Sequence, residues 1–144
     1  MSARNKAMDL LARREHSAYE LRQKLKLREF DSDAIELALE SLQRDNLQSD
    51  SRFTESYINH RINAGLGPIK LANELRQRGV NDELINQHMS AVSIDWDEQL
   101  ERQRIKKYGE EIPSDYKLKM KQARFLQNRG FSPESVLRLL LGSY

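Results

Sequence analysis

The stretch that decides the fold runs from residue 50 to residue 89 and reads DSRFTESYINHRINAGLGPIKLANELRQRGVNDELINQHM. Its apolar residues recur every three or four positions in three short runs, and this spacing predicts three amphipathic helices. Helices this short cannot bury a core alone, so we expect the same unit to recur on both sides. The apolar positions are Phe53, Tyr57, Ile58 and Ile62, then Ile69, Leu71 and Leu75, then Leu84, Ile85 and Met89.

The ends of these three helices carry helix start and stop signals. Asp50 or Ser51 is expected to open the first helix. Pro68 suits the first turn of the second, because its missing N–H would have no intrahelical partner there. Gly79 fits the left-handed position just past a helix end, and the pair Asn81-Asp82 is suited to cap the third helix.

The same spacing of apolar residues recurs in the flanking sequence. An offset of fifty residues relates the first repeat to the middle one, and an offset of fifty-one relates the middle repeat to the third. Because the spacing of packing positions is what stacked repeats require, this is a repeat signal. The matches are Leu21 and Leu25 with Leu71 and Leu75, Ile35 with Ile85, and Arg78-Gly79-Val80 with Arg129-Gly130-Phe131.

The sequence therefore predicts an all-α protein made of three tandem three-helix, helix-turn-helix-like repeats that form an elongated and curved array. We place the repeats at residues 1–48, 49–94 and 95–144. No segment shows the sustained alternation of apolar and polar residues that is typical of a β-strand. Neighbouring repeats are expected to contact each other, which produces a long binding surface instead of a pocket.

Local motifs support the outer repeats. Ser17 and Glu20 form a capping-box pattern, and Asp95 is placed to cap the first helix of the third repeat. In the first repeat, the third helix is expected to bury Ile35, Leu37, Leu39 and Leu42.

Composition narrows the class of protein. The 144 residues include 32% charged and 7% aromatic residues, which suits thin helical layers better than one deep globule. There is no cysteine for a disulfide or a thiolate metal site, and no apolar run long enough to cross a membrane. The net charge is +2, with an excess of three positive charges in residues 96–144. This excess is small for a protein whose main task is to grip phosphates.

No motif indicates catalysis, a metal or a cofactor. The three histidines, His16, His60 and His88, lie in different repeats without metal-ligand spacing, so we expect local structural roles. The run Gly65-Leu66-Gly67-Pro68 resembles a phosphate loop only superficially, because its proline lacks an amide that such a loop would use. We therefore predict a protein that is not an enzyme.

Basic residues are the best functional candidates. They follow the middle helix of each repeat, where the alternatives are a solvated surface and a ribbon of positive charge that meets acidic protein or DNA phosphates. Within them, Arg22 and Lys26 share a face, as do Lys117, Lys121 and Arg124. The candidates are Arg22, Lys26, Arg52, Lys70, Arg76, Arg78, Lys117, Lys121, Arg124 and Arg129.

Two residues keep open alternatives. Arg52 either contacts a partner or pairs with Asp50 or Glu55 to hold the turn between repeats. Most aromatic residues are expected to pack between repeats, and Tyr116 is the one whose exposure would favour contact with nucleic acid.

These motifs together resemble the bacterial RecX family over nearly the whole chain. Two positions depart from the family pattern, because Glu29 stands where a glycine is usual and Asn46 replaces a glycine in a turn. Asn46 is still able to adopt the left-handed conformation. The residues that carry the resemblance are Arg14-Glu15-His16-Ser17, Asp50-Ser51-Arg52-Phe53, Gly67-Pro68-Ile69, Glu74-Leu75-Arg76-Gln77-Arg78-Gly79-Val80, Asp95-Trp96, Lys107-Tyr108-Gly109 and Arg124-Phe125-Leu126-Gln127-Asn128-Arg129-Gly130-Phe131.

The resemblance implies a cytoplasmic protein, expected to be a monomer, that binds the RecA filament on single-stranded DNA. It implies negative modulation of RecA: restrained filament extension and lower ATPase, strand-exchange and co-protease activities, with consequences for recombination, DNA repair and the SOS response. The family is not known for catalysis of its own. The alternative interpretation is a helical repeat protein that binds nucleic acid directly, at least weakly.

Overall fold

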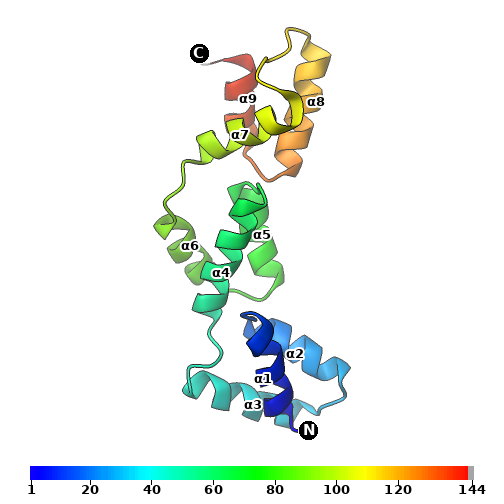
Figure 1. Cartoon of the computed structure of the whole chain (residues 1–144), viewed down its shortest axis with the longest axis vertical. Coiled ribbons are helices and arrows are strands. Elements are labelled where there is room, and N and C mark those ends of the chain that lie inside the picture. Colours follow the sequence, from blue (N-terminus) through cyan, green and yellow to red (C-terminus); the bar gives the residue numbers. More distant parts are fainter. Residues whose placement is uncertain (143–144) are drawn as a thin grey trace. The chain divides into compact units, whose positions relative to one another are not determined.

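The computed structural model describes residues 1–142, which contain nine helices and no strand (Figure 1). The predicted all-α class is therefore confirmed over this range. The helices are α1 (Ala3–Arg13), α2 (Ala18–Leu27), α3 (Ser32–Arg44), α4 (Asp50–Asn63), α5 (Pro68–Gln77), α6 (Asp82–Ala91), α7 (Trp96–Tyr108), α8 (Tyr116–Asn128) and α9 (Pro133–Leu141).

These helices form two compact units, and the division runs through the middle of the chain. The first unit comprises Met1–Ile58 and Leu75–Ser90, and the second comprises Asn59–Glu74 and the chain from Ala91 onward. Both α4 and α5 are divided between the units. The middle helix triplet is thus shared between the two units, whereas the predicted repeat boundaries lie in the connections before α4 and α7 and stay a prediction.

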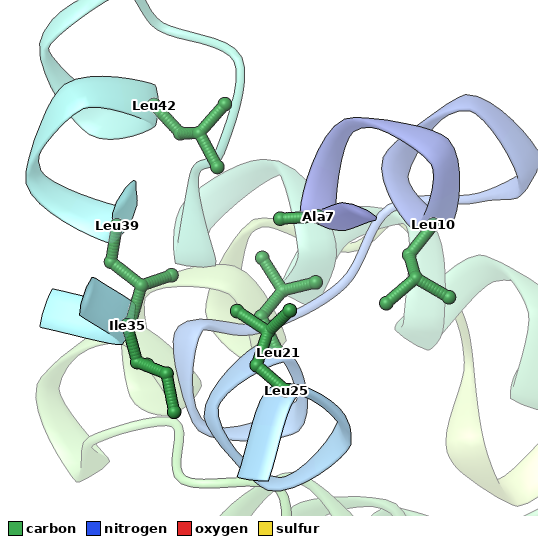
Figure 2. Close-up of a cluster of buried hydrophobic side chains, with 7 residues drawn as sticks. All are labelled: Ala7, Leu10, Leu21, Leu25, Ile35, Leu39 and Leu42. Carbon is green, nitrogen blue, oxygen red and sulfur yellow. The ribbon is translucent and has the colours of Figure 1, made fainter. Parts of the chain in front are cut away.

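The core of the first unit lies among α1, α2 and α3. Figure 2 shows its side chains converging from these three helices. The expectation for Leu37 is wrong, because this side chain is 67% exposed and the adjacent Ala38 is buried instead. Ala38 lies three residues after Ile35 and four before Leu42, so it falls on the buried stripe of α3, which Leu37 does not. The cluster contains Ala7, Leu10, Leu21, Leu25, Ile35, Leu39 and Leu42.

The second unit has its own core, built from α7, α8 and α9 together with the turn before α9. Trp96, Phe125 and Leu139 are half-buried and pack against this cluster. Burying an aliphatic or aromatic side chain of this size contributes about 1.5–3 kcal/mol to stability, so each unit is stabilised by its own hydrophobic core. The buried members are Leu100, Ala123, Leu126, Phe131, Val136 and Leu140.

The expected helix caps form as predicted, including Asn81, whose Oδ1 accepts from the Leu84 amide at 2.8 Å at the start of α6. Ser17 and Glu20 complete a capping box, and Asp95 accepts two amides at the start of α7. Helix α4 begins at Asp50, as expected, and its side-chain cap is the preceding Ser49, whose Oγ accepts from the Arg52 amide at 3.1 Å. The Asp50 carboxylate is used elsewhere, as the acceptor for the backbone N–H of Ala18 at 2.8 Å, the first residue of α2.

In the first unit, the start of α2 meets the turn that follows α5. The Ser17 hydroxyl donates to the backbone oxygen of Arg78 at 2.7 Å, and the Glu20 carboxylate lies 3.8 Å from the Arg78 guanidinium. The positive end of one helix dipole therefore faces the negative end of another, an arrangement that is electrostatically favourable.

In the second unit, the start of α5 meets the turn that follows α8 in the same manner. The Gly67 amide donates to the Arg129 oxygen at 2.7 Å, and the Ile69 amide donates to the Gly130 oxygen at 2.9 Å. Pro68, between them, has no amide to satisfy. Backbone groups that a helix terminus would leave unpaired are thus paired by the terminus of another helix.

Glu29 occupies the turn after α2 with φ +66°, where the corresponding turns after α5 and α8 have Gly79 at +80° and Gly130 at +101°. A residue with a Cβ pays about 1–2 kcal/mol of strain in this left-handed region, which glycine avoids. Part of that advantage is cancelled, because glycine loses more conformational entropy on folding. We expect Glu29→Gly to raise the free energy of unfolding by about 0.5–1 kcal/mol, measured by urea denaturation. The control is Glu40→Gly inside α3, which should destabilise, and a loss of stability in Glu29→Gly would contradict the argument.

Candidate binding surface

The described part of the chain offers open grooves and exposed helix faces. No group of three or more histidine, aspartate or glutamate residues within residues 1–142 is arranged to hold a metal ion. None of the nine helices is both long enough and apolar enough to cross a lipid bilayer.

The strongest basic surface lies on α8. Lys117, Lys121 and Arg124 are exposed on one face, as their spacing predicts, and none of them forms an ion pair within the described residues. The helix itself carries no carboxylate. Tyr116, the aromatic residue singled out from the sequence, is 65% exposed at the start of this helix beside Lys117. This face can therefore approach an acidic surface or phosphates without first breaking an internal ion pair.

The base of the same helix gathers two more cations around one aromatic ring. The guanidinium of Arg129 and the ammonium of Lys107 each lie 5.3 Å from the centre of the Phe125 ring. Arg129 also donates to the backbone oxygen of Ala64 at 3.2 Å. Lys70 lies close to this turn, because a Cβ placed on Gly130 would collide with the Lys70 side chain. The structure thus brings Lys70, Arg129 and the α8 face into one unit.

Arg76 and Arg78, the other two candidate cations on or just after α5, have internal partners. Arg76 lies 2.7 Å from the carboxylate of Asp82. Arg78 pairs with Glu20 and places its guanidinium 4.7 Å above the centre of the Tyr57 ring. Both arginines therefore stabilise the first unit in this structure.

The first repeat shows the same contrast between paired and exposed cations. Arg22 forms a two-point ion pair with Glu36, at 2.8 and 3.1 Å, which raises the pKa of Arg22 and lowers the pKa of Glu36. Lys26, on the same face of α2, is exposed without an ion pair among the described residues. Arg22 therefore has to exchange a partner before it binds anything else.

Arg52 contacts neither of the residues that the sequence suggested. Its guanidinium lies 3.2 Å from Glu15 and donates to both the side-chain and backbone oxygens of Asn46, each at 2.9 Å. Asn46 has φ +59°, the left-handed conformation expected at this turn. The expectation of a structural pair was right in kind and wrong in partner, because the connection before α4 folds Asn46 back towards it.

Arg104 was not singled out from the sequence, and it is almost completely buried. Its guanidinium donates to the backbone oxygens of Glu110 and Glu111, at 2.7 and 3.4 Å, while its Nε has no partner in the described structure. It thereby holds the inserted loop that follows α7. Arg104 lies four residues after the buried Leu100, so the period of α7 places it on the buried stripe, but its residue type favoured a solvated position.

His16 is a buried titratable group just before the start of α2. Its Nδ1 lies 3.0 Å from the Arg14 carbonyl oxygen and its Nε2 lies 3.0 Å from the Lys24 ammonium. A carbonyl only accepts, so Nδ1 carries the proton and Nε2 accepts from Lys24. Burial, followed by the charges of Arg14 and Lys24, lowers the pKa of His16 from its ordinary value of 6.5. A structural role, as expected from the sequence, fits these contacts.

This arrangement makes stability depend on pH. Because the pKa of His16 is lower in the folded chain than in the unfolded one, the unfolded chain binds the proton first as pH falls below 6.5. We expect the free energy of unfolding to be fully retained above this pH and to fall below it by up to about 1.4 kcal/mol per pH unit. Urea denaturation between pH 7.5 and 5 measures it. His16→Gln should flatten this profile and His60→Gln, at an exposed position, should not; equal profiles for all three proteins would contradict the assignment.

The fold and the surface define a class: a helical repeat protein with exposed basic helix faces and open grooves. Three family models match the chain in order, described as the first, second and third three-helix domains of RecX, over residues 3–42, 49–89 and 95–140. The chain belongs to the RecX family.

Curated relatives agree over nearly the full length. A protein of Pseudomonas putida called regulatory protein RecX is 42% identical over 142 residues, which covers 99% of this chain and 91% of the relative. One of Halorhodospira halophila with the same name is 39% identical, covering 94% and 84%. At these identities the chain is a member of a family of regulatory proteins.

Two solved structures have the same fold. A crystal structure of a regulatory protein RecX matches with a TM-score of 0.82 at 23% identity, covering 96% of this chain and 71% of that one. The crystal structure of RecX from Lactobacillus salivarius matches with a TM-score of 0.72 at 20% identity, covering 96% and 94%.

Proposed function

We infer that this chain binds the RecA filament on single-stranded DNA and negatively modulates RecA, by binding alone and without turnover. The observation that carries this proposal is family membership across all three repeats, at about 40% identity to regulatory proteins. In this view the protein acts in the cytoplasm as a monomer, restrains filament extension, and lowers ATPase, strand-exchange and co-protease activities. Recombination, DNA repair and the SOS response would be regulated accordingly.

The distribution of charge supports a particular division of labour between repeats. The cations of α8 are exposed and unpaired within the described residues, whereas Arg22, Arg52, Arg76 and Arg78 already have internal partners. An ion pair at a surface contributes little because two solvated charges must be desolvated and ordered to form it. Binding through α8 needs no such exchange, so Lys117, Lys121 and Arg124 are the first contacts that we assign to the filament. Lys26, Lys70 and Arg129 are assigned weaker, supporting contacts.

Repetition offers a reason for regulation at low protein ratios. Several weak sites on one chain gain affinity once the first has bound, because the others then bind at a high effective concentration. The filament presents the same protomer many times, so a chain of like modules is suited to it. Capping a growing filament affects every protomer that would have been added later.

The test is the ATPase activity of RecA on single-stranded DNA, titrated with this protein from one molecule per hundred RecA protomers upward. Inhibition is expected well below one molecule per protomer, and the purified chain alone should hydrolyse no ATP. Unchanged RecA activity at a stoichiometric excess would refute the proposal. Hydrolysis of ATP by the chain alone would revive an enzymatic function.

Direct binding to single-stranded DNA is the second candidate, favoured by the exposed Tyr116 ring beside Lys117. Three phosphate contacts from α8 predict a slope of about −2 in log affinity against log salt, or roughly a twentyfold loss between 50 and 200 mM. Fluorescence anisotropy with a labelled oligonucleotide measures this. Binding to bare DNA that does not depend on salt would reject this candidate. So would a lack of binding to DNA when RecA is not present.

A further inference from the structure

An open groove of about 800 Å³ runs between α1 and α2 in the first unit. Its size lies within the range of roughly 300–1,000 Å³ that binding sites in proteins occupy. The groove is lined entirely by apolar and cationic residues: Met1, Lys6, Leu10, Arg13, Lys24, Leu27, Arg28 and Phe30. None of these residues belongs to the surface assigned above to the RecA filament.

The apolar side of the groove centres on Leu27, which is 84% exposed at the end of α2. The repeats offer an internal comparison, because the equivalent positions in the second and third repeats are Gln77 and Asn128. The first repeat alone therefore presents an aliphatic side chain here. Leu10 and Phe30 also line the groove. Leu10 belongs to the core of the unit, and Phe30 packs against that core. The groove therefore combines the exposed aliphatic Leu27 with the half-buried Phe30 and the buried Leu10.

The rim of the groove carries positive charge that nothing in the described chain neutralises. Lys6, Arg13 and Arg28 form no ion pair, and no carboxylate lines the groove. Other arginines of the same two helices are paired: Arg4 with Asp45, Arg14 with Glu20, and Arg22 with Glu36. Among the described residues of α1 and α2, Lys26 is also unpaired but lies outside the groove, whereas the three unpaired cations Lys6, Arg13 and Arg28 line it together.

The fourth cation, Lys24, directs its ammonium to the neutral ring of His16 and not to an acid. Burial and the neighbouring charges of Arg14 and Arg13 lower the pKa of Lys24, although Glu20 opposes this effect. These cations therefore repel one another, and a negative group placed in the groove would relieve that repulsion.

We propose that this groove binds an acidic segment of a partner protein that inserts a large apolar side chain beside Leu27. A peptide fits better than a nucleic acid, because the exposed apolar groups are the aliphatic Leu27 and Met1, and the single ring, Phe30, is half-buried. Bases need an exposed aromatic surface for stacking. Carboxylates on the segment would face Lys6, Arg13 and Arg28, which act as the specificity-determining rim.

The test uses fluorescence anisotropy with a labelled 14-residue peptide that has leucines at helical spacing and glutamates elsewhere, without RecA or DNA. A matched peptide with glutamine in place of every glutamate keeps the apolar face and removes the charge. We expect the acidic peptide to bind at least tenfold more tightly than the glutamine peptide, and amide shifts in an NMR titration to map to Leu10, Leu27 and Phe30. Equal affinity for the two peptides would overturn the proposal.

Variants then locate the site. Leu27→Gln installs the residue that the second repeat uses, and it should weaken binding of the acidic peptide about tenfold with an unchanged melting temperature, since this side chain is exposed. Lys6→Gln with Arg13→Gln should weaken it by a similar factor. Matched controls are Leu37→Gln, at an exposed leucine of α3, and Arg44→Gln, at an exposed arginine outside the groove; neither should change affinity.

Three outcomes decide against an acidic protein segment. One is a Leu27→Gln variant with unchanged affinity for the peptide. Another is a single-stranded oligonucleotide that binds the groove more tightly than the peptide and shifts the same amides. The third is concentration-dependent self-association that Leu27→Gln abolishes, which would make a second copy of the chain the occupant. Since neither RecA nor DNA is present in the peptide assay, its failure leaves the proposed regulation of RecA standing.

Discussion

Replacing Gly67 with alanine is expected to lower the free energy of unfolding by about 2–3 kcal/mol, the upper part of the usual range for overpacking. The added Cβ would lie 2.5 Å from the Gly130 carbonyl carbon and 2.7 Å from the Phe131 nitrogen. These are backbone atoms, so no side chain is able to rotate away. The start of α5 has to withdraw, and both hydrogen bonds from this turn to the end of α8 are strained with it.

A matched glycine separates this steric effect from backbone strain. Gly109, which ends α7, has φ +89° but open space where a Cβ would be added. Gly109→Ala should therefore show only backbone strain, which is about 1–3 kcal/mol in its extended conformation with positive φ. Urea denaturation followed by circular dichroism compares the two variants. If Gly67→Ala lowered the free energy of unfolding by less than about 1 kcal/mol, the close approach of α5 to the turn after α8 would be wrong.

Reversing the charges of α8 is expected to have the largest effect on activity. The variant Lys117→Glu/Lys121→Glu/Arg124→Glu should need about a hundredfold more protein to inhibit RecA ATPase, on the basis of roughly 1 kcal/mol for each reversed contact. These side chains are exposed and unpaired among the described residues, so folding should not be affected. The titration described above, repeated with the variant, is the measurement.

A control variant has the same net charge but keeps the α8 face. Arg44→Glu/Lys106→Glu/Arg138→Glu changes three exposed cations on other helices. It should inhibit within a few-fold of the unaltered protein, apart from a general loss of electrostatic attraction that added salt suppresses. Equal loss of inhibition in both variants would mean that overall charge, and not this helix face, governs binding.

Periodicity predicted the helices well because each depends on residues close together in the chain. The buried stripe of α2, the capping box at Ser17 and the left-handed turns at Asn46 and Gly79 all follow from local patterns. Leu37 shows the limit of the method. An apolar residue inside a helical pattern was assigned to the core by type, although its position lies off the stripe that faces α1 and α2.

Partners of the charged residues were the least predictable feature. Arg52 contacts Glu15 and Asn46, and Arg78 contacts Glu20 and Tyr57. Arg104 is buried and donates to the loop that follows α7. Most of these partners lie in turns and loops, and long side chains choose among several acceptors at similar cost. The sequence identified the α8 face correctly as exposed and basic because that helix contains no acid to pair with.

By itself, the sequence determined that this chain is helical, that its modules repeat about every fifty residues, and which family it belongs to. Those properties follow from local spacing and from residue types. Only the tertiary structure decided that the middle triplet divides between two compact units, that the ends of α5 meet the start of α2 and the end of α8, and that one groove is left with uncompensated charge. The reason is physical. Backbone groups at helix ends and charged side chains pair with groups from distant parts of the chain, and the spacing of residues along the sequence does not specify which groups will meet.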